Sequence, residues 1–269
     1  MATSTNTLYS NLPASIVISG TTHYFAATSA SISLSPKIEA DRNLSSLPPL
    51  TFKVGGNLET KISLSFLAVH NDDFTAARQV VSILTGDLSS NIIIGGETFE
   101  SCYLDNLSIE MVPFLPVMIN ADFTTFKINY ANGVSSTPTL TSLPKSGICY
   151  GHNIVASTEK NLTPTKESLS YKVSCSRTPR FRIGDGDSSF CFLDSVEKEL
   201  SIKSNDIEGF MDFKSFGAIV YFDLKTESGI SLTTSPISFS NNSKLSTQNL
   251  SINAEDVLAG QVTLREIVL

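Results

Sequence analysis

The chain has 269 residues, of which 41% are hydrophobic, 17% are charged and none is Trp. Its formal net charge is -7, and no basic stretch of the kind that binding to the phosphates of duplex DNA requires is visible. No apolar run approaches the ~20 residues of a membrane-spanning helix. The first residues also lack the basic and apolar regions of a secretory signal, so we expect synthesis in a cytosol and no membrane partner.

Alternating apolar residues predict strands along the first half of the chain. Ala30, Ile32 and Leu34 alternate with serines, which is the pattern of a strand with one buried face. The same alternation predicts strands in 62–66, 103–111 and 117–123. Between the alternating stretches 30–34 and 62–66, residues 36–59 contain Pro48-Pro49 and Gly55-Gly56 and predict a long loop or extended arm.

One segment of the first half has a helical period instead. Asn71-Asp72-Asp73 offers an N-cap, and apolar residues then recur at spacings of three and four. Gly86 stands where a helix C-cap favours a residue with positive φ. These features predict an α-helix at about 72–85.

The second half repeats this order of elements. Residues 131–147 carry two prolines and two glycines without apolar periodicity, and predict a linker. After it come alternating strands at 169–175 and 200–202, a shorter helix at about 206–217, and further strands. Asn106-Leu107-Ser108-Ile109 returns as Asn249-Leu250-Ser251-Ile252, and offsets between matching stretches run from 134 to 143 residues.

These patterns predict a mainly β protein made of two tandem β-barrel or sandwich units. The first unit covers residues 1–130 and the second covers 148–269. Each unit has one flanking α-helix and long loops. The alternative is one large sandwich in which the spacing of the repeats is coincidental.

No set of residues typical of catalysis, cofactor binding or metal binding is visible, so we assign no site residues and expect no cofactor and no enzymatic activity. The histidines have no metal-ligand spacing, and Asp185-Gly186-Asp187 lacks the Gly and Glu of an EF-hand loop, which favours a hairpin turn. The cysteines form no C-x-x-C pair, and we expect reduced, buried thiols, with a disulfide or zinc site as the alternative. A glycosidase with acids far apart in the sequence is not excluded. The histidines and cysteines are His23, His70, His152, Cys102, Cys149, Cys175 and Cys191.

Three groups of residues occur together in this chain: Ile16-x-Ile18-x-Gly20-Thr21-Thr22-x-Tyr24 with residues 27–35 and Glu39-x-x-Arg42; Ile94-Gly95-Gly96-x-Thr98-Phe99 with 103–109; and Pro116-Val117-x-Ile119-x-Ala121-x-Phe123. Together they resemble tail tube and related virion proteins of tailed bacteriophages. The resemblance covers about 14–127 and, more weakly, 165–269, where the Gly-Gly turn and the Pro-x-x-Pro step are missing.

The resemblance implies a tail tube subunit, in which a β-barrel or sandwich is flanked by one helix and a long loop. Rings of such subunits stack into a tube through which DNA passes as cargo without specific binding. Two units per chain imply a trimer with pseudo-sixfold symmetry, or else a hexamer. Other tail proteins are then the partners, and the virion tail is the location after synthesis in the host cytoplasm.

Residues 1–140 carry 6 basic and 11 acidic side chains, so we expect this acidic half to line the channel. The helix at 72–85 and the 36–59 loop are expected to make ring and stacking contacts. The alternatives are another tail component of the same fold (a baseplate, distal tail or neck/terminator protein) and a carbohydrate-binding or adhesin module.

Overall fold

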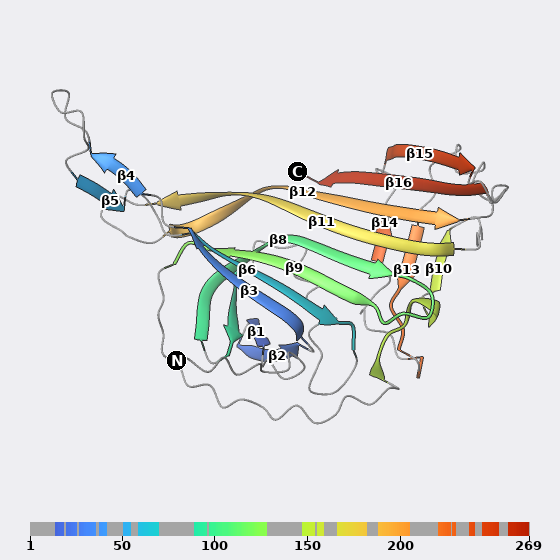
Figure 1. Cartoon of the computed structure of the whole chain (residues 1–269), viewed down its shortest axis with the longest axis horizontal. Coiled ribbons are helices and arrows are strands. Elements are labelled where there is room, and N and C mark those ends of the chain that lie inside the picture. The colour runs from blue at the N-terminus through green and yellow to red at the C-terminus, as the bar shows by residue number, and fades with distance from the viewer. Residues whose placement is uncertain are drawn as a thin grey trace, which may run out of the picture.

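The described part of the chain consists almost entirely of antiparallel strands (Figure 1), which confirms the mainly β class. The computed structural model describes residues 14–18, 20–25, 27–35, 38–41, 51–54, 59–69, 89–95, 97–127, 147–153, 155–158, 166–181, 188–204, 220–226, 228–229, 237–239, 244–252 and 258–268. The strands are β1 (Ala14–Ile18), β2 (Thr21–Phe25), β3 (Ala27–Ser35), β4 (Ile38–Asp41), β5 (Thr51–Val54), β6 (Glu59–Leu67), β7 (Ser90–Ile94), β8 (Glu97–Met111), β9 (Met118–Thr125), β10 (Val155–Thr158), β11 (Lys166–Phe181), β12 (Ser188–Ser204), β13 (Val220–Asp223), β14 (Ile237–Phe239), β15 (Lys244–Ile252) and β16 (Leu258–Val268), with a short 3-10 helix at Gly151–Asn153.

Eight strands form the main sheet, in the order β3-β6-β9-β8-β11-β12-β16-β15. Every pair of neighbours in this order is antiparallel. The β8–β11 pair joins strands from the two halves of the sequence, and its register runs from Met111 opposite Leu169 to Asn106 opposite Ser174. The main sheet is therefore continuous across the halves that the predicted linker separates.

Strand β8 belongs to two sheets because it bends at Ser101. Its first residues pair with β7, whereas the residues from Tyr103 onward pair with β9. Ser101 has a φ of 52°, and its amide N–H donates to the Asn91 side chain at 3.1 Å. The bend carries the chain from the main sheet into a smaller layer in which β7 pairs with β1, and β1 with β2.

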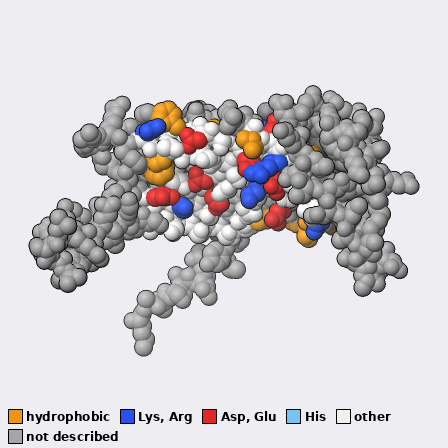
Figure 2. All heavy atoms as spheres, turned by 90° about the horizontal axis from the view of Figure 1, so that it is seen from above, with side chains coloured by type: hydrophobic (Ala, Val, Ile, Leu, Met, Phe, Trp, Pro, Cys, Tyr) orange, Lys and Arg blue, Asp and Glu red, His pale blue; other side chains and the backbone are white. Residues whose placement is uncertain are grey.

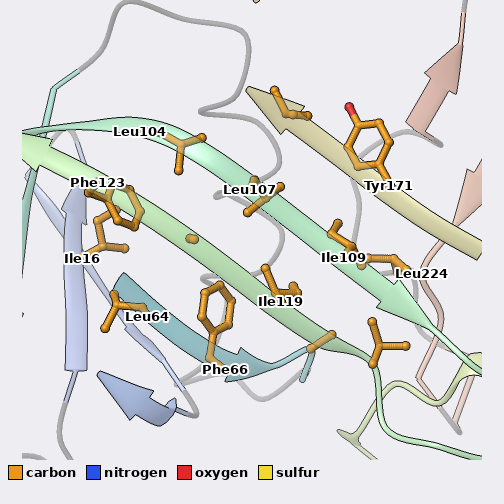
Figure 3. Packing of buried hydrophobic residues seen from close by; sticks show 14 of the residues in the cluster. Ile16, Leu64, Phe66, Leu104, Leu107, Ile109, Ile119, Phe123, Tyr171 and Leu224 are labelled. Atoms are coloured by element: carbon orange, nitrogen blue, oxygen red, sulfur yellow. The ribbon is translucent and has the colours of Figure 1, made fainter. Parts of the chain in front are cut away.

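The core lies between the main sheet and these smaller strands (Figure 3). Along β6, Ile62, Leu64 and Phe66 are buried while the residues between them are not, as the alternation predicts. Ile16 of β1 and Ile92 of β7 are fully buried in the same cluster. Removing this much apolar surface from water is the main stabilising contribution in such a layered β structure.

A third layer covers the same side of the second half of the main sheet (Figure 1), where β13 pairs with β10 and β14. Leu224, directly after β13, is fully buried in the common cluster together with Tyr171 of β11. Cys149 also joins that cluster, and its N–H donates to the Ala68 carbonyl at 2.9 Å. The start of the second half is thus packed against the first.

The alternating stretches at 30–34, 62–66, 103–111, 169–175 and 200–202 all lie in strands, as predicted. The arm expected within 36–59 contains the β4–β5 hairpin, which Figure 1 shows beyond the end of the main strands. The four cysteines form no disulfide, and Cys102, Cys149 and Cys191 are buried as predicted, whereas Cys175 is only half-buried. The helices expected at about 72–85 and 206–217, linker residues 131–146 and the Asp185-Gly186 turn lie outside the described residues.

Truncation of Leu107 is expected to destabilise the fold strongly, because this side chain is fully buried opposite Ala121 of β9 and Val173 of β11. Leu107→Ala should lower the free energy of unfolding by about 2–5 kcal/mol, since it leaves a cavity where the two halves meet. Urea unfolding followed by circular dichroism measures this loss. The matched change Glu110→Ala, at an exposed position of the same strand, should cost less than about 0.5 kcal/mol. Equal losses in the two variants would contradict the assigned core.

Candidate functional surface: the polar face and edges of the main sheet

The face of the main sheet that points away from the core carries mostly small polar side chains. Ser65 donates to Asn120 at 2.6 Å on the first half of this face, and Gln261 donates to Ser201 at 2.8 Å on the second. Figure 2 looks down on this side, where short polar side chains and backbone separate scattered charges. Every second residue along a main strand belongs to this face. The residues of the face include Ser29, Ser31, Ser33, Ser63, Ser65, Ser108, Asn120, Asp122, Ser170, Lys172, Ser174, Glu197, Glu199, Ser201, Thr263 and Arg265.

Charges on this polar face are mixed in sign and leave a small negative excess. Several are paired: the Arg265 guanidinium contacts the Glu197 carboxylate, with one N–O distance of 2.6 Å, and Lys61 lies 3.3 Å from Glu59. A phosphate-binding surface needs a clear excess of cations, so this face is unsuited to holding DNA. On the first half the charged residues are Glu59, Asp105, Glu110, Asp122 and Lys61; on the second they are Asp194, Glu197, Glu199, Lys172, Arg180, Lys203 and Arg265.

Arg177 closes the junction between the halves at the point where β8 stops pairing with β11. Its Nε donates to the Leu104 carbonyl at 3.2 Å, and its guanidinium lies 5.3 Å from the centre of the Tyr103 ring. Burial raises the pKa of the neighbouring Asp105 carboxyl, whereas the Thr124 hydroxyl that donates to it and the Arg177 charge lower that pKa. The arrangement therefore fixes the positions of β8 and β11 where their pairing ends.

The main sheet ends in two edge strands, β3 and β15. Among the described residues, β3 pairs with β6 alone and β15 with β16 alone. Because seven antiparallel steps separate them, the two edge strands run in opposite directions. Ile32 and Leu34 of β3 are 41% and 50% exposed, although their partners Ile62 and Thr60 are buried. Such an edge exposes both backbone hydrogen-bonding groups and apolar side chains to another chain.

The pairing order of the first four main strands recurs in the second four. In the first set β3 pairs with β6, β6 with β9, and β9 with β8. In the second set β11 pairs with β12, β12 with β16, and β16 with β15. The β8–β11 pair joins the last strand of the first set to the first strand of the second.

Residues that the sequence raised as metal candidates are not brought together. Within the described ranges, no group of three or more His, Cys, Asp or Glu side chains is placed to hold a metal ion. His152 is exposed and stacks on Phe114, whereas His70, Asp185 and Asp187 fall outside the described residues. Burial raises the pKa of the Cys102 thiol to about 12, which keeps it protonated at neutral pH. No helix in the described part of the chain has the length and apolarity to cross a membrane.

Sequence reasoning missed two features of this surface. The role of Arg177 had no signal, since nothing in a single strand shows that its neighbour bends away at Ser101. Nor could the sequence show that β3 lies at an edge of the main sheet, although its alternating serines do indicate one polar face. Comparison of the sequence with models of protein families and with curated proteins finds no match.

Asp105→Asn is expected to stabilise the protein at pH 7. The folded pKa of Asp105 is raised above the ordinary aspartate value of 3.8, so its contribution to stability is fully present below pH 3.8 and is lost as pH rises through the folded pKa. Asn cannot ionise but still accepts the Thr124 hydrogen bond. Urea unfolding at pH 7 and pH 3.5 should show the variant more stable at pH 7 and similar at pH 3.5.

Thr124→Val is the complementary control for this prediction, because it removes the hydroxyl that stabilises the ionised carboxylate. Its loss of stability should be larger at pH 7 than at pH 3.5. An Asp105→Asn variant less stable than the wild type at pH 7 would mean that attraction to Arg177 outweighs burial.

Proposed function

We propose that this chain is a structural protein of a bacteriophage tail, a tail tube subunit whose copies join edge to edge into rings around a DNA-conducting channel. The observation that carries the proposal is the β8–β11 pair, by which two similarly ordered sets of four strands join within one chain. A protein built to form rings needs the same kind of junction between chains. The free edges β3 and β15 supply the two halves of such a junction.

The repeated pairing order supports a duplication into two tandem sandwich units, 1–130 and 148–269. Asn106–Ile109 lies in β8 and its copy Asn249–Ile252 lies in β15, each strand being the last of its set. The smaller layers also match: β1 pairs with β7 and β7 with the start of β8, as β10 pairs with β13 and β13 with β14. By this correspondence β15 is equivalent to β8, and β3 is equivalent to β11.

The proposed junction between chains therefore has the same kind of strand pairing as the β8–β11 junction within one chain. β15 of one chain pairs with β3 of the next, in the same antiparallel sense as β8 with β11. Repetition of this contact closes a ring when the rotation between neighbouring chains is a whole fraction of a full turn. Three chains give six units and pseudo-sixfold symmetry, and a hexamer is the alternative.

The polar face suits the wall of such a channel. Its short hydroxyl side chains make no large projections, and its slight acidity repels phosphate. The first half of this face carries four acidic residues and one basic residue, which supports the proposal that this half lines the channel. DNA then passes as cargo, without catalysis or a cofactor, and other tail proteins are the partners at the ends of the tube in the virion.

Native mass spectrometry and negative-stain electron microscopy of the purified protein test the proposal. Rings of three or six chains and tubes built from stacked rings are the expected result. Rings that never stack would favour a baseplate, distal tail or neck/terminator protein of the same fold. Monomers alone at high concentration would contradict the proposal.

The double variant Ile32→Lys/Leu34→Lys is expected to remain monomeric. Charges placed on the apolar side of an edge strand prevent it from joining another sheet, because pairing would bury them without partners. Size-exclusion chromatography with light scattering measures the mass. The matched control is Glu110→Lys, which places a lysine at an exposed position of β8 where the strand is paired on both sides. Assembly of the double variant at wild-type concentrations would rule out β3 as a contact edge.

A further inference from the structure

The turn between β8 and β9 exposes a cluster of apolar side chains that neither the core nor the sheet edges explain. Val112, Phe114 and Leu115 are all exposed, and the Phe114 side chain is 80% exposed. We call these three residues the apolar tip. Single exposed apolar residues are common on protein surfaces, but a contiguous group around a bare aromatic ring is typical of an interaction site.

The backbone beneath the apolar tip is fixed by hydrogen bonds. The Leu115 N–H donates to the Val112 carbonyl at 3.2 Å, and the Gly151 N–H donates to the Leu115 carbonyl at 3.0 Å. A Cβ on Gly151 would lie 2.0 Å from the Val112 oxygen, so only glycine permits this approach. The 147–153 segment therefore holds the turn in place.

Phe114 itself is held in an unfavourable conformation. Its φ of 65° lies in the left-handed region, which is uncommon and strained for a bulky residue. The ring stacks on the exposed His152 ring at 5.3 Å instead of turning into the core. A strained backbone that presents an aromatic ring to solvent is better explained by a contact with another molecule than by the stability of the single chain.

The apolar tip and the β4–β5 arm lie at opposite ends of the same strands. β6 starts at Glu59, where the arm ends, and finishes at Leu67, whose partner Met118 follows the tip. Figure 1 shows the arm at one end of the main sheet and the β8 terminus at the other. In a ring formed by side-by-side pairing, the two ends of the strands face the ring above and the ring below.

The arm, residues 36–58, is longer than the fold requires. Ser35 and Glu59 are direct partners at its base, just as Phe181 and Ser188 are partners where β11 turns into β12. In the second half, residues 182–187 are sufficient to make the connection. The arm strands carry Ile38, Phe52 and Val54 in their sequences, which provides apolar residues for an apolar contact.

We propose that the apolar tip is the docking site for the β4–β5 arm of a second copy of this chain in the next ring. The proposal rests on the proposed function, and it names the contact that stacks rings into a tube. The contact is head to tail, since each chain uses its arm on one neighbour and its tip on the other. Such a contact does not close on itself and extends into a tube.

Two variants test the docking site. Phe114→Ser removes the ring, and an armless variant replaces residues 36–58 by Asn-Gly, a two-residue turn suited to the paired ends Ser35 and Glu59. Native mass spectrometry should still detect rings of wild-type mass, whereas electron microscopy should show that stacked tubes are lost. Phe192→Ser is the matched control, because Phe192 is exposed on the sheet next to Arg180 and away from the tip, and its tubes should persist.

Mixing the two variants tests the direction of the contact. Rings of Phe114→Ser keep the arm, and armless rings keep the tip. In the mixture the arm of a Phe114→Ser ring can therefore dock on the tip of an armless ring, whereas the outer faces of that pair cannot bind a further ring. Pairs of rings should form in the mixture and not in either variant alone.

Several results would overturn the proposal. Tubes of wild-type length from either variant would assign the tip to a different partner, such as another tail protein. Loss of rings in Phe114→Ser would place the tip inside the ring. A wild type that forms rings without tubes overturns the docking contact alone, and a wild type without rings overturns the proposed function as well.

Discussion

The structure depends on one set of backbone hydrogen bonds, those between β8 and β11. Through them the two halves of the chain share a single main sheet, with Ile109 opposite Tyr171 and Leu107 opposite Val173 on its buried side. A sheet edge left open in solution tends to pair with another chain. Within this chain that tendency is satisfied at the centre of the sheet, whereas β3 and β15 each have a strand partner on one side only among the described residues.

The bend of β8 makes this junction compatible with a layered core. Ser101 turns β8 into the smaller layer. Beyond the last β8–β11 pair, the Arg177 side chain donates to the Leu104 carbonyl of β8, which lies outside the β8–β11 register. One strand thus closes a core on one side while the opposite face of the main sheet carries mostly small polar side chains. The division between an apolar side that packs and a polar side that remains open is what a channel wall requires.

Local patterns predicted much of this fold from the sequence. Alternation at 30–34, 62–66 and 103–111 predicted strands because one face of each strand packs against apolar residues while the other meets water. The repeated order of elements indicated two similar sets of strands, but it did not predict which strands pair. The candidate surface was harder to predict, because edges depend on which strands meet in space. No periodic pattern in the sequence indicates that Phe114 is exposed or that Gly151 lies close to Val112.

The central claim is that β15 of one chain pairs with β3 of the next, as β8 pairs with β11. Hydrogen–deuterium exchange of the assembled protein, compared with a monomeric edge variant, tests it most directly. The account predicts that amides in 27–35 and 244–252 exchange more slowly in the assembly, while those in 106–111 are equally protected in both. Unchanged exchange in both edge strands, with new protection elsewhere in the chain, would contradict it.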